Sequence, residues 1–333
     1  MNEQTASFQT VLDSLLAPGK DFPRRYLRYF SDIAPLELQT LMDIWSRVKP
    51  DRKLSLLEGL LSMADSDTLV DFEDFARAIL DDPEATVRTY AIRLLDREAC
   101  EDVKLVPTFI NLLKNDPDVN VRAEAASALN LFVDLGELEE ISEEVYGEIQ
   151  SILLDSAKGA EETRVRRRAL ESLGWSSNPE VVELIESAFD GNIDWKVSAL
   201  VAMGRSADDR WEDRVLRSML DDNDKTRKAA VQSAGMLGFK SARLPLLRML
   251  ETEESDEVMS AAIWSLSQIG GEDVQIVLEK LLDETEDEDL VAFLEEALDN
   301  LAFTEDLDRF ELMSFDPDEL EDLEVLDDEE EEA

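Results

Sequence analysis

Apolar residues along much of the chain recur every four positions, in short blocks. The clearest blocks start at Val87, Val121 and Val165, and each has alanine four positions later and leucine eight positions later. A spacing of four places these positions on one face of an α-helix. The pattern therefore predicts helices with an apolar stripe, in which a small central residue lets a neighbouring helix approach closely.

The blocks themselves return with a nearly fixed period. The three clearest read Val-Arg-x-x-Ala, and four weaker copies start at Trp195, Thr226, Val258 and Leu290. From Val87 onward the intervals are 34, 44, 30, 31, 32 and 32 residues. A period of this length is typical of similar supersecondary units stacked in a row. The 44-residue interval predicts an insertion near residues 134–144, as an extended helix or an acidic loop.

A second helix is expected to follow each first helix. Glycine adopts the left-handed backbone of a helix end at little cost. Four glycines lie at or just past the predicted ends of first helices: Gly174, Gly204, Gly238 and Gly270. Further apolar stretches then occupy residues 181–185, 215–220, 244–250 and 274–282. Each unit is therefore predicted to be a helical hairpin.

Three regions follow from this pattern. Residues 1–75 lack a clean repeat but contain amphipathic stretches, so we expect a helical N-terminal cap with a polar outer face. Residues 76–303 carry the repeats. Residues 304–333 are expected to form a largely disordered acidic tail, because segment 305–333 has 16 acidic residues against one basic residue, Arg309.

The unit resembles the HEAT repeat, particularly the short bacterial and archaeal type also seen in bilin-lyase-like proteins. An Asp-Pro turn, the Val-Arg pair, the alanine after it and a helix-ending Leu-Gly carry the resemblance. The turns and helix ends concerned are Asp82-Pro83, Asp116-Pro117, Leu173-Gly174 and Leu237-Gly238. The resemblance covers roughly residues 76–303. It implies an all-α, armadillo-like solenoid that binds proteins or scaffolds assemblies.

Charge narrows the choice of partners. The chain of 333 residues has 79 acidic and 33 basic side chains, a net charge of −46. Such a field repels nucleic acid phosphates and anionic lipid headgroups, so we expect neither nucleic acid nor membrane as a partner. Two interpretations of the acidity stay open: solubility or adaptation to high salt, and recruitment of a cationic protein.

The residue types also argue against catalysis. The chain has no histidine and one cysteine, Cys100, which lies among carboxylates that disfavour a thiolate. We therefore predict no catalytic residue, no metal site and no cofactor. A single cysteine also excludes an intrachain disulfide and favours a reducing, cytoplasmic compartment. No run approaches 18 apolar residues, so a membrane-spanning helix is not expected.

One cation recurs at the same position of successive repeats. This ladder comprises Arg88, Arg122, Arg166, Lys196 and Arg227, whereas Met259 and Val291 replace the arginine in later copies. A row of cations could contact an acidic partner. The favoured interpretation is structural, with each cation pairing with a turn aspartate such as Asp82 or Asp116 and fixing neighbouring units.

A basic and aromatic island near the N-terminus is the candidate protein-binding site. It comprises Arg24, Arg25, Tyr26, Arg28 and Tyr29. Arginine and tyrosine are common anchors of interfaces. The island could equally be a solvated helix face, or it could receive the acidic tail.

Three functions are compatible with these observations. The first is a non-catalytic scaffold or adaptor whose concave face, lined by second helices, binds a protein. The alternative is an acidic binding chaperone or charge mimic for a cationic protein. The third is an enzyme resembling bilin lyases, although no residue can be named for its catalysis. Neither the partner's identity nor the oligomeric state follows from the residues.

Overall fold

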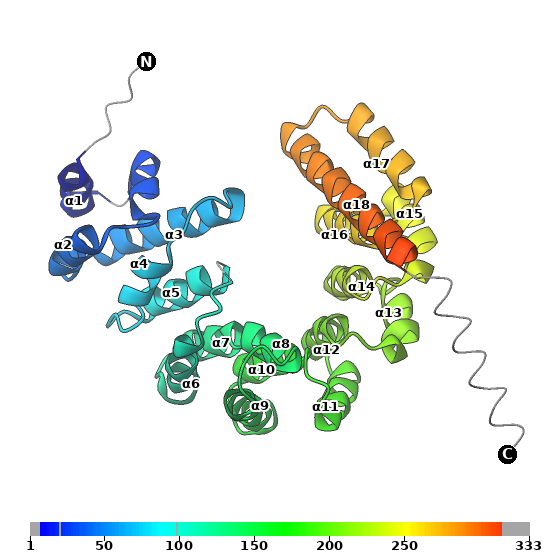
Figure 1. Ribbon diagram of the computed structural model, residues 1–333, viewed down its shortest axis with the longest axis horizontal. Coiled ribbons are helices and arrows are strands. Elements are labelled where there is room, and N and C mark those ends of the chain that lie inside the picture. The colour runs from blue at the N-terminus through cyan, green and yellow to red at the C-terminus, as the bar shows by residue number, and fades with distance from the viewer. Residues whose placement is uncertain (1–6, 20, 98, 315–333) are drawn as a thin grey trace, which may run out of the picture. The chain divides into compact units, whose positions relative to one another are not determined.

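The chain is helical throughout the part that the structure describes. The computed structural model describes residues 7–19, 21–97 and 99–314 (Figure 1), with the backbone alone for residues 308–314. Within these ranges all regular elements are α-helices or short 3-10 helices. The predicted all-α class is confirmed. None of the described helices is both long and apolar enough to cross a bilayer.

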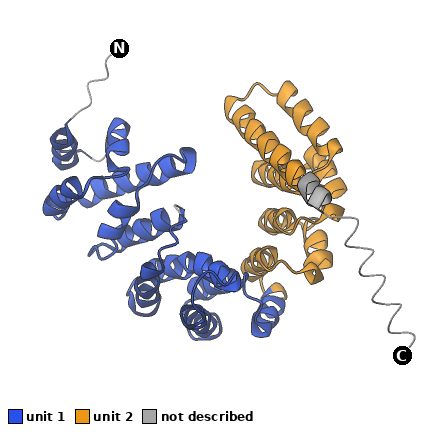
Figure 2. Cartoon of the chain, in the orientation of Figure 1, with its two compact units in different colours: residues 1–188 blue, residues 189–333 orange. Residues whose placement is uncertain are grey.

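The chain divides into two compact units, residues 1–188 and 189–333 (Figure 2). Unit 1 contains α1 (Phe8–Leu16), η1 (Arg24–Phe30), α2 (Pro35–Trp45), α3 (Pro50–Ser66), α4 (Glu73–Ala78), α5 (Ala85–Arg97), η2 (Val103–Leu105), α6 (Val106–Asn115), α7 (Val119–Ala128), α8 (Asn130–Glu137), α9 (Glu143–Lys158), α10 (Thr163–Leu173) and nearly all of α11 (Pro179–Phe189). Unit 2 contains α12 (Ile193–Arg205), η3 (Asp209–Trp211), α13 (Glu212–Ser218), α14 (Asp224–Met236), η4 (Lys240–Ala242), α15 (Arg243–Thr252), α16 (Asp256–Ile269), α17 (Glu272–Glu284) and α18 (Glu288–Ser314).

In both units the first helices of the hairpins stack directly on one another. In unit 1 the stack runs from α3 through α5 and α7 to α10, and in unit 2 from α12 through α14 and α16 to α18. The second helices flank these stacks: α6 packs on α7, α13 on α14, α15 on α16 and α17 on α18 (Figure 1). The predicted solenoid of helical hairpins is confirmed, but each of these second helices packs mainly on the first helix that follows it and not on the one that precedes it.

The small central residue of each repeat lies at the bottom of these helix contacts. Its side chain is 0% exposed in six copies: Ala91, Ala125, Ala169, Ala199, Ala230 and Ala262. Two of the weaker anchors differ from the pattern, because Trp195 is only half-buried and Leu290 is 37% exposed. The column of small residues is therefore the constant part of the core.

A second column of small polar residues ties adjacent first helices together. The hydroxyl groups of Ser172, Ser233 and Ser265 donate to backbone carbonyl oxygens of the preceding first helix, at 2.8, 2.7 and 2.9 Å. The approach is close, since a Cβ on Gly204 would lie 3.0 Å from the Cα of Ser233. Each hydroxyl satisfies its own hydrogen-bonding capacity inside the stack.

The structure adds detail to three predicted segments. The stack already includes α3, which lies within the region expected to be a cap. The insertion near residues 134–144 forms the end of α8 and the start of α9, with a short turn between them. At the C-terminal end, α18 continues through residues 304–314, where a disordered tail was expected, and residues 315–333 lie outside the described residues.

Replacing Ala262 by aspartate is expected to lower the free energy of unfolding by about 3–5 kcal/mol, because an unpaired charge would be buried between stacked helices. Ala169→Asp should act similarly in unit 1. The control is Ala292→Asp, the same change at an exposed position of α18. Chemical denaturation followed by circular dichroism measures the effect. Equal midpoints for Ala262→Asp and the control would contradict the assigned packing.

Candidate functional site

Arg88 on α5 joins two consecutive turns. Its Nε and one Nη donate to the two carboxylate oxygens of Asp116, both at 2.8 Å, and the other Nη donates to the carbonyl oxygen of Asp82 at 2.7 Å. Arg88 and Asp116 are 9% and 8% exposed. A bidentate contact fixes the planar guanidinium relative to the carboxylate. Arg88 therefore holds the turn before its own helix against the turn of the next unit.

The same arrangement recurs in unit 2. Arg227 on α14 donates to both carboxylate oxygens of Glu253, at 2.9 and 2.7 Å, and to the carbonyl oxygen of Asp221 at 3.0 Å. Lys196 on α12 donates to the carboxylate of Asp221 at 2.6 Å. Consecutive turns of unit 2 are thus linked by consecutive ladder residues.

The two remaining ladder residues lie in unit 1. Arg122 on α7 donates to Glu161 at 3.2 Å and to the carbonyl oxygen of Asp116 at 2.9 Å. Arg166 on α10 donates to the carbonyl oxygen of Ala157 at 3.1 Å. Arg122 therefore contacts a carboxylate and a turn carbonyl, as Arg88 does, but through a single hydrogen bond to the carboxylate.

Lys53 extends the ladder to α3, where the sequence analysis did not place a repeat. Its Nζ donates to the carboxylate of Asp82 at 2.9 Å, and the indole Nε1 of Trp45 donates to the same oxygen at 2.6 Å. Lys53 is 3% and Asp82 6% exposed. The first turn carboxylate thus receives a cation from the preceding helix, as Asp116 does.

Both partners are missing together at one joint. Glu253 precedes Met259 by six residues, just as Asp82 precedes Arg88, and Thr285 precedes Val291 by the same interval. Met259 on α16 therefore stands where the cation would be, and Thr285 stands where the carboxylate would be. The joint therefore has neither a cation without a carboxylate nor a carboxylate without a cation at these two positions.

Each turn carboxylate also holds its own turn. Asp116 accepts the backbone N–H of Asp118 at 2.9 Å, and Glu253 accepts that of Ser255 at 3.0 Å. A carboxylate that caps a turn and binds a cation of the previous unit couples local and long-range structure. We infer that the ladder is a structural joint between repeats, because its donors are directed into the protein.

The N-terminal island divides into a buried and an exposed part. Tyr26 is 9% exposed, and its ring lies 6.2 Å from the ring of Phe22 and 6.2 Å from that of Tyr29. The guanidinium of Arg25 lies over the Tyr26 ring, 4.8 Å from its centroid. Tyr26 therefore packs in the core, where a partner could not reach most of its ring.

The other arginines of the island face solvent. Arg28 is ion-paired with Asp67, and Arg24 is exposed. The island as a protein-binding site stays a prediction, in which the exposed side chains are those of Arg24, Arg25 and Arg28, and Tyr29 is half-buried.

Cys100 has an environment that suppresses reactivity. The thiol is 8% exposed, and burial raises its pKa above the usual value of 9.0. A guanidinium N–H of Arg77 lies 3.3 Å from the sulfur. Among the described residues, no group of His, Cys, Asp or Glu side chains has the arrangement of a metal site.

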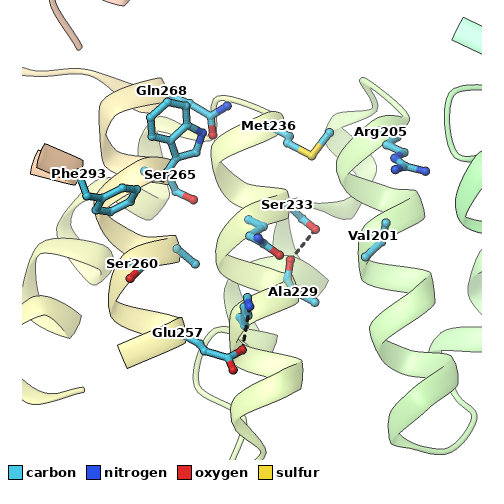
Figure 3. A pocket seen from close by; sticks show the side chains of 14 residues that line it. Val201, Arg205, Ala229, Ser233, Met236, Glu257, Ser260, Ser265, Gln268 and Phe293 are labelled. Carbon is cyan, nitrogen blue, oxygen red and sulfur yellow. Dashed lines mark hydrogen bonds and ion pairs between the residues drawn. The ribbon is translucent and has the colours of Figure 1, made fainter. Parts of the chain in front are cut away.

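A groove of about 740 Å³ lies in unit 2, across α12, α14, α16 and α18 (Figure 3). Small residues of the stacked helices form its floor: Ala229, Ser233, Ala261 and Ser265. Because these side chains are short, the larger side chains around them enclose a hollow. The groove lies on first helices, whereas the sequence analysis placed the binding face on second helices.

The side chains above this floor are largely apolar. The rings of Trp264 and Phe293 are stacked, with centroids 6.3 Å apart and planes 30° from parallel. Met236 is 47% exposed, and Val201 lies at the opposite side from Phe293 (Figure 3). Methionine and aromatic side chains are typical of surfaces that bind other proteins.

Polar groups occur at defined places in the groove. Lys228 and Glu257 form an ion pair of 2.8 Å, and Arg205 lies at the end formed by α12 (Figure 3). The amides of Gln232 and Gln268 are available for hydrogen bonds to a peptide backbone. The groove thus combines an apolar centre with a few polar groups, as binding sites usually do.

Trp264 and Phe293 were not among the functional candidates that the sequence pattern predicted. Trp264 lies six positions after the anchor Val258, and Phe293 lies three after Leu290. In a helix an offset of six falls on the side opposite the stripe formed by the anchor and the residues four and eight positions on, and an offset of three falls at the edge of that stripe. Aromatic residues at such offsets in two successive repeats were the available signal.

Replacing Arg88 by alanine is expected to destabilise the protein by about 3 kcal/mol, because it leaves the carboxylate of Asp116 buried without its cation. The control is Lys158→Ala, which removes the exposed ion pair with Glu180, whose side chains are 42% and 59% exposed; its cost should stay below about 1 kcal/mol. Urea denaturation measures both. Similar losses in the two variants would contradict the buried joint.

The Arg227–Glu253 joint should lose its contribution in acid. The hydrogen bond from Arg227 holds the pKa of Glu253 below its usual value of 4.5. A lowered folded pKa gives stability that is present above pH 4.5 and is lost as pH falls through the folded value. Glu253→Gln should therefore approach the wild type in unfolding free energy below pH 4.5. A difference that stayed constant between neutral and acidic pH would exclude this linkage.

Comparison with known proteins identifies the type of repeat. A family model of HEAT repeats matches residues 73–143 and 214–299, in both units, and no curated protein matches the chain. Similar solved structures include Escherichia coli YibA (18% identity, 86% of this chain and 99% of that chain, TM-score 0.40). Another is the CpcE–CpcF complex of phycocyanin lyase from Nostoc (16% identity, 69% of this chain and 94% of that chain, TM-score 0.46). A third is human deoxyhypusine hydroxylase (14% identity, 89% of this chain and 96% of that chain, TM-score 0.35).

The family match agrees with the repeat period, the buried alanine column and the stacked hairpins. The two matched segments are therefore built of HEAT repeats.

Proposed function

We propose that this protein is a non-catalytic scaffold that binds a partner protein through the groove of unit 2. The observation that carries the proposal is the apolar lining of the groove by Met236, which is 47% exposed, and by the half-buried rings of Trp264 and Phe293. Apolar side chains gathered on a surface hollow favour contact with another protein, because their burial removes them from water. Large aromatic anchors commonly supply most of the binding energy of such contacts.

The groove is suited to a segment and not to a small metabolite. It is open along the helices and has few polar groups, whereas a site for a small molecule usually encloses most of its ligand. Its walls come from four consecutive first helices, each fixed by packing on its neighbours. A preformed rigid surface lowers the entropy cost of binding.

An acidic binding chaperone is the second candidate. Its support is the net charge of −46, to which residues 315–333 contribute twelve carboxylates and no cation. In that function the acidic C-terminal segment would hold a cationic protein by itself. Partner binding would then depend on this segment and on salt.

Affinity purification from the source cells is expected to recover a partner with the full chain and to lose it with the double variant Trp264→Ala/Phe293→Ala. The matched control is Leu220→Ala, which removes an apolar side chain that is 79% exposed elsewhere in unit 2. Quantitative mass spectrometry of the recovered proteins is the measurement.

A chain that ends at residue 314 separates the two candidates. A scaffold that uses the groove keeps its partner in this form. Loss of the partner from the shortened chain, with full retention by the groove variant, would favour the acidic chaperone and exclude the groove.

A further inference from the structure

The two ends of the unit 2 groove differ in charge. At the end formed by α12 the charged lining residue is Arg205. At the end formed by α18, Phe293 has Asp289 one turn before it and Glu296 one turn after it, and both carboxylates are exposed. Residues three or four apart lie on the same side of a helix, so these carboxylates border the aromatic wall.

The middle of the groove is nearly neutral. Lys228 lines it, but its ammonium is paired with Glu257 at 2.8 Å. The remaining polar lining residues, such as Gln232 and Gln268, are uncharged. Apolar contact therefore dominates at the centre, and charge selects the partner at the ends.

The surroundings strengthen the negative end. Residues 189–314 contain 30 acidic and 13 basic side chains. Twelve further carboxylates follow in residues 315–333. Such an excess attracts cationic segments over about a Debye length and raises their association rate.

We propose that the groove binds a cationic amphipathic segment of its partner, with apolar side chains over Trp264, Phe293 and Met236 and with lysine or arginine side chains over α18. This inference rests on the proposed function and specifies the partner's chemistry. Asp289 and Glu296 are then the residues that select the partner, because they flank the apolar contact. The geometry corresponds to an amphipathic helix lying in an apolar groove.

Synthetic peptides test the inference with the full chain. Three labelled peptides of about 16 residues, about 24 Å long as helices, share one apolar face of leucines and differ in the other face, which carries lysine, glutamine or glutamate. Fluorescence anisotropy measures binding at several salt concentrations. The lysine peptide should bind about tenfold more tightly than the glutamine peptide at low salt, and this gap should narrow as salt rises.

Two matched double variants distinguish the effect of carboxylates beside the groove from the effect of the protein's overall negative charge. Asp289→Asn/Glu296→Gln removes two carboxylates beside Phe293, one in the first turn of α18 and one farther along. Glu272→Gln/Glu279→Gln removes two exposed carboxylates at corresponding places of α17, which does not line the groove. The first double variant should lower the affinity for the lysine peptide roughly fivefold. The second should change this affinity less than about twofold.

The outcomes distinguish this inference from the proposed function. If the lysine peptide binds no better than the other two, and Trp264→Ala/Phe293→Ala still weakens the binding of all three peptides, the inference is overturned but the proposed function is not. Equal effects of the two carboxylate pairs also overturn it, since the general field would then suffice. Absence of binding by every peptide, or binding indifferent to the aromatic variant, overturns both.

Discussion

An ion pair between a first helix and the turn of the next repeat recurs at most joints of the described repeats and gives them a fixed direction. Contact between alanine columns brings helices close but is not directional, so it does not fix how one hairpin is rotated on the next. The Arg88–Asp116 pair adds that direction, because a bidentate contact allows one relative orientation. At the joint of Met259 and Thr285 both the cation and the carboxylate are absent, so neither charge is left without its partner there.

The sequence predicted the buried face well because one helical face needs only local spacing. The alanines at Ala91 and Ala262 follow directly from a spacing of four, and both are fully buried. The partners of the joint were less accessible. Lys53 contacts Asp82 across 29 positions, and no local pattern marks it, since the repeat motif is degraded before residue 76. Long-range pairs depend on how units stack, and this is a property of the tertiary structure.

The groove escaped prediction for a different physical reason. A spacing of four identifies the buried side of a helix. It does not show which of the two helices of a hairpin exposes its opposite side to solvent. Small residues beside the alanine column, such as Ser233 and Ser265, create the floor, and the same serines bond to the neighbouring helix. Close packing and the hollow thus have one cause: short side chains on the first helices let the backbones approach and leave space above them.

The joints also explain part of the surface charge. In unit 2 the cations Lys196, Arg227 and Lys228 are held by carboxylates of neighbouring turns and helices. A cation committed to a carboxylate contributes little net field, whereas the unmatched acidic side chains are left to determine it. A solenoid built with such joints and with a large acidic excess therefore has a stable interior and a negative exterior at once. In the function that we propose, the apolar groove removes a partner's side chains from water, and the acidic surroundings decide which partners reach it.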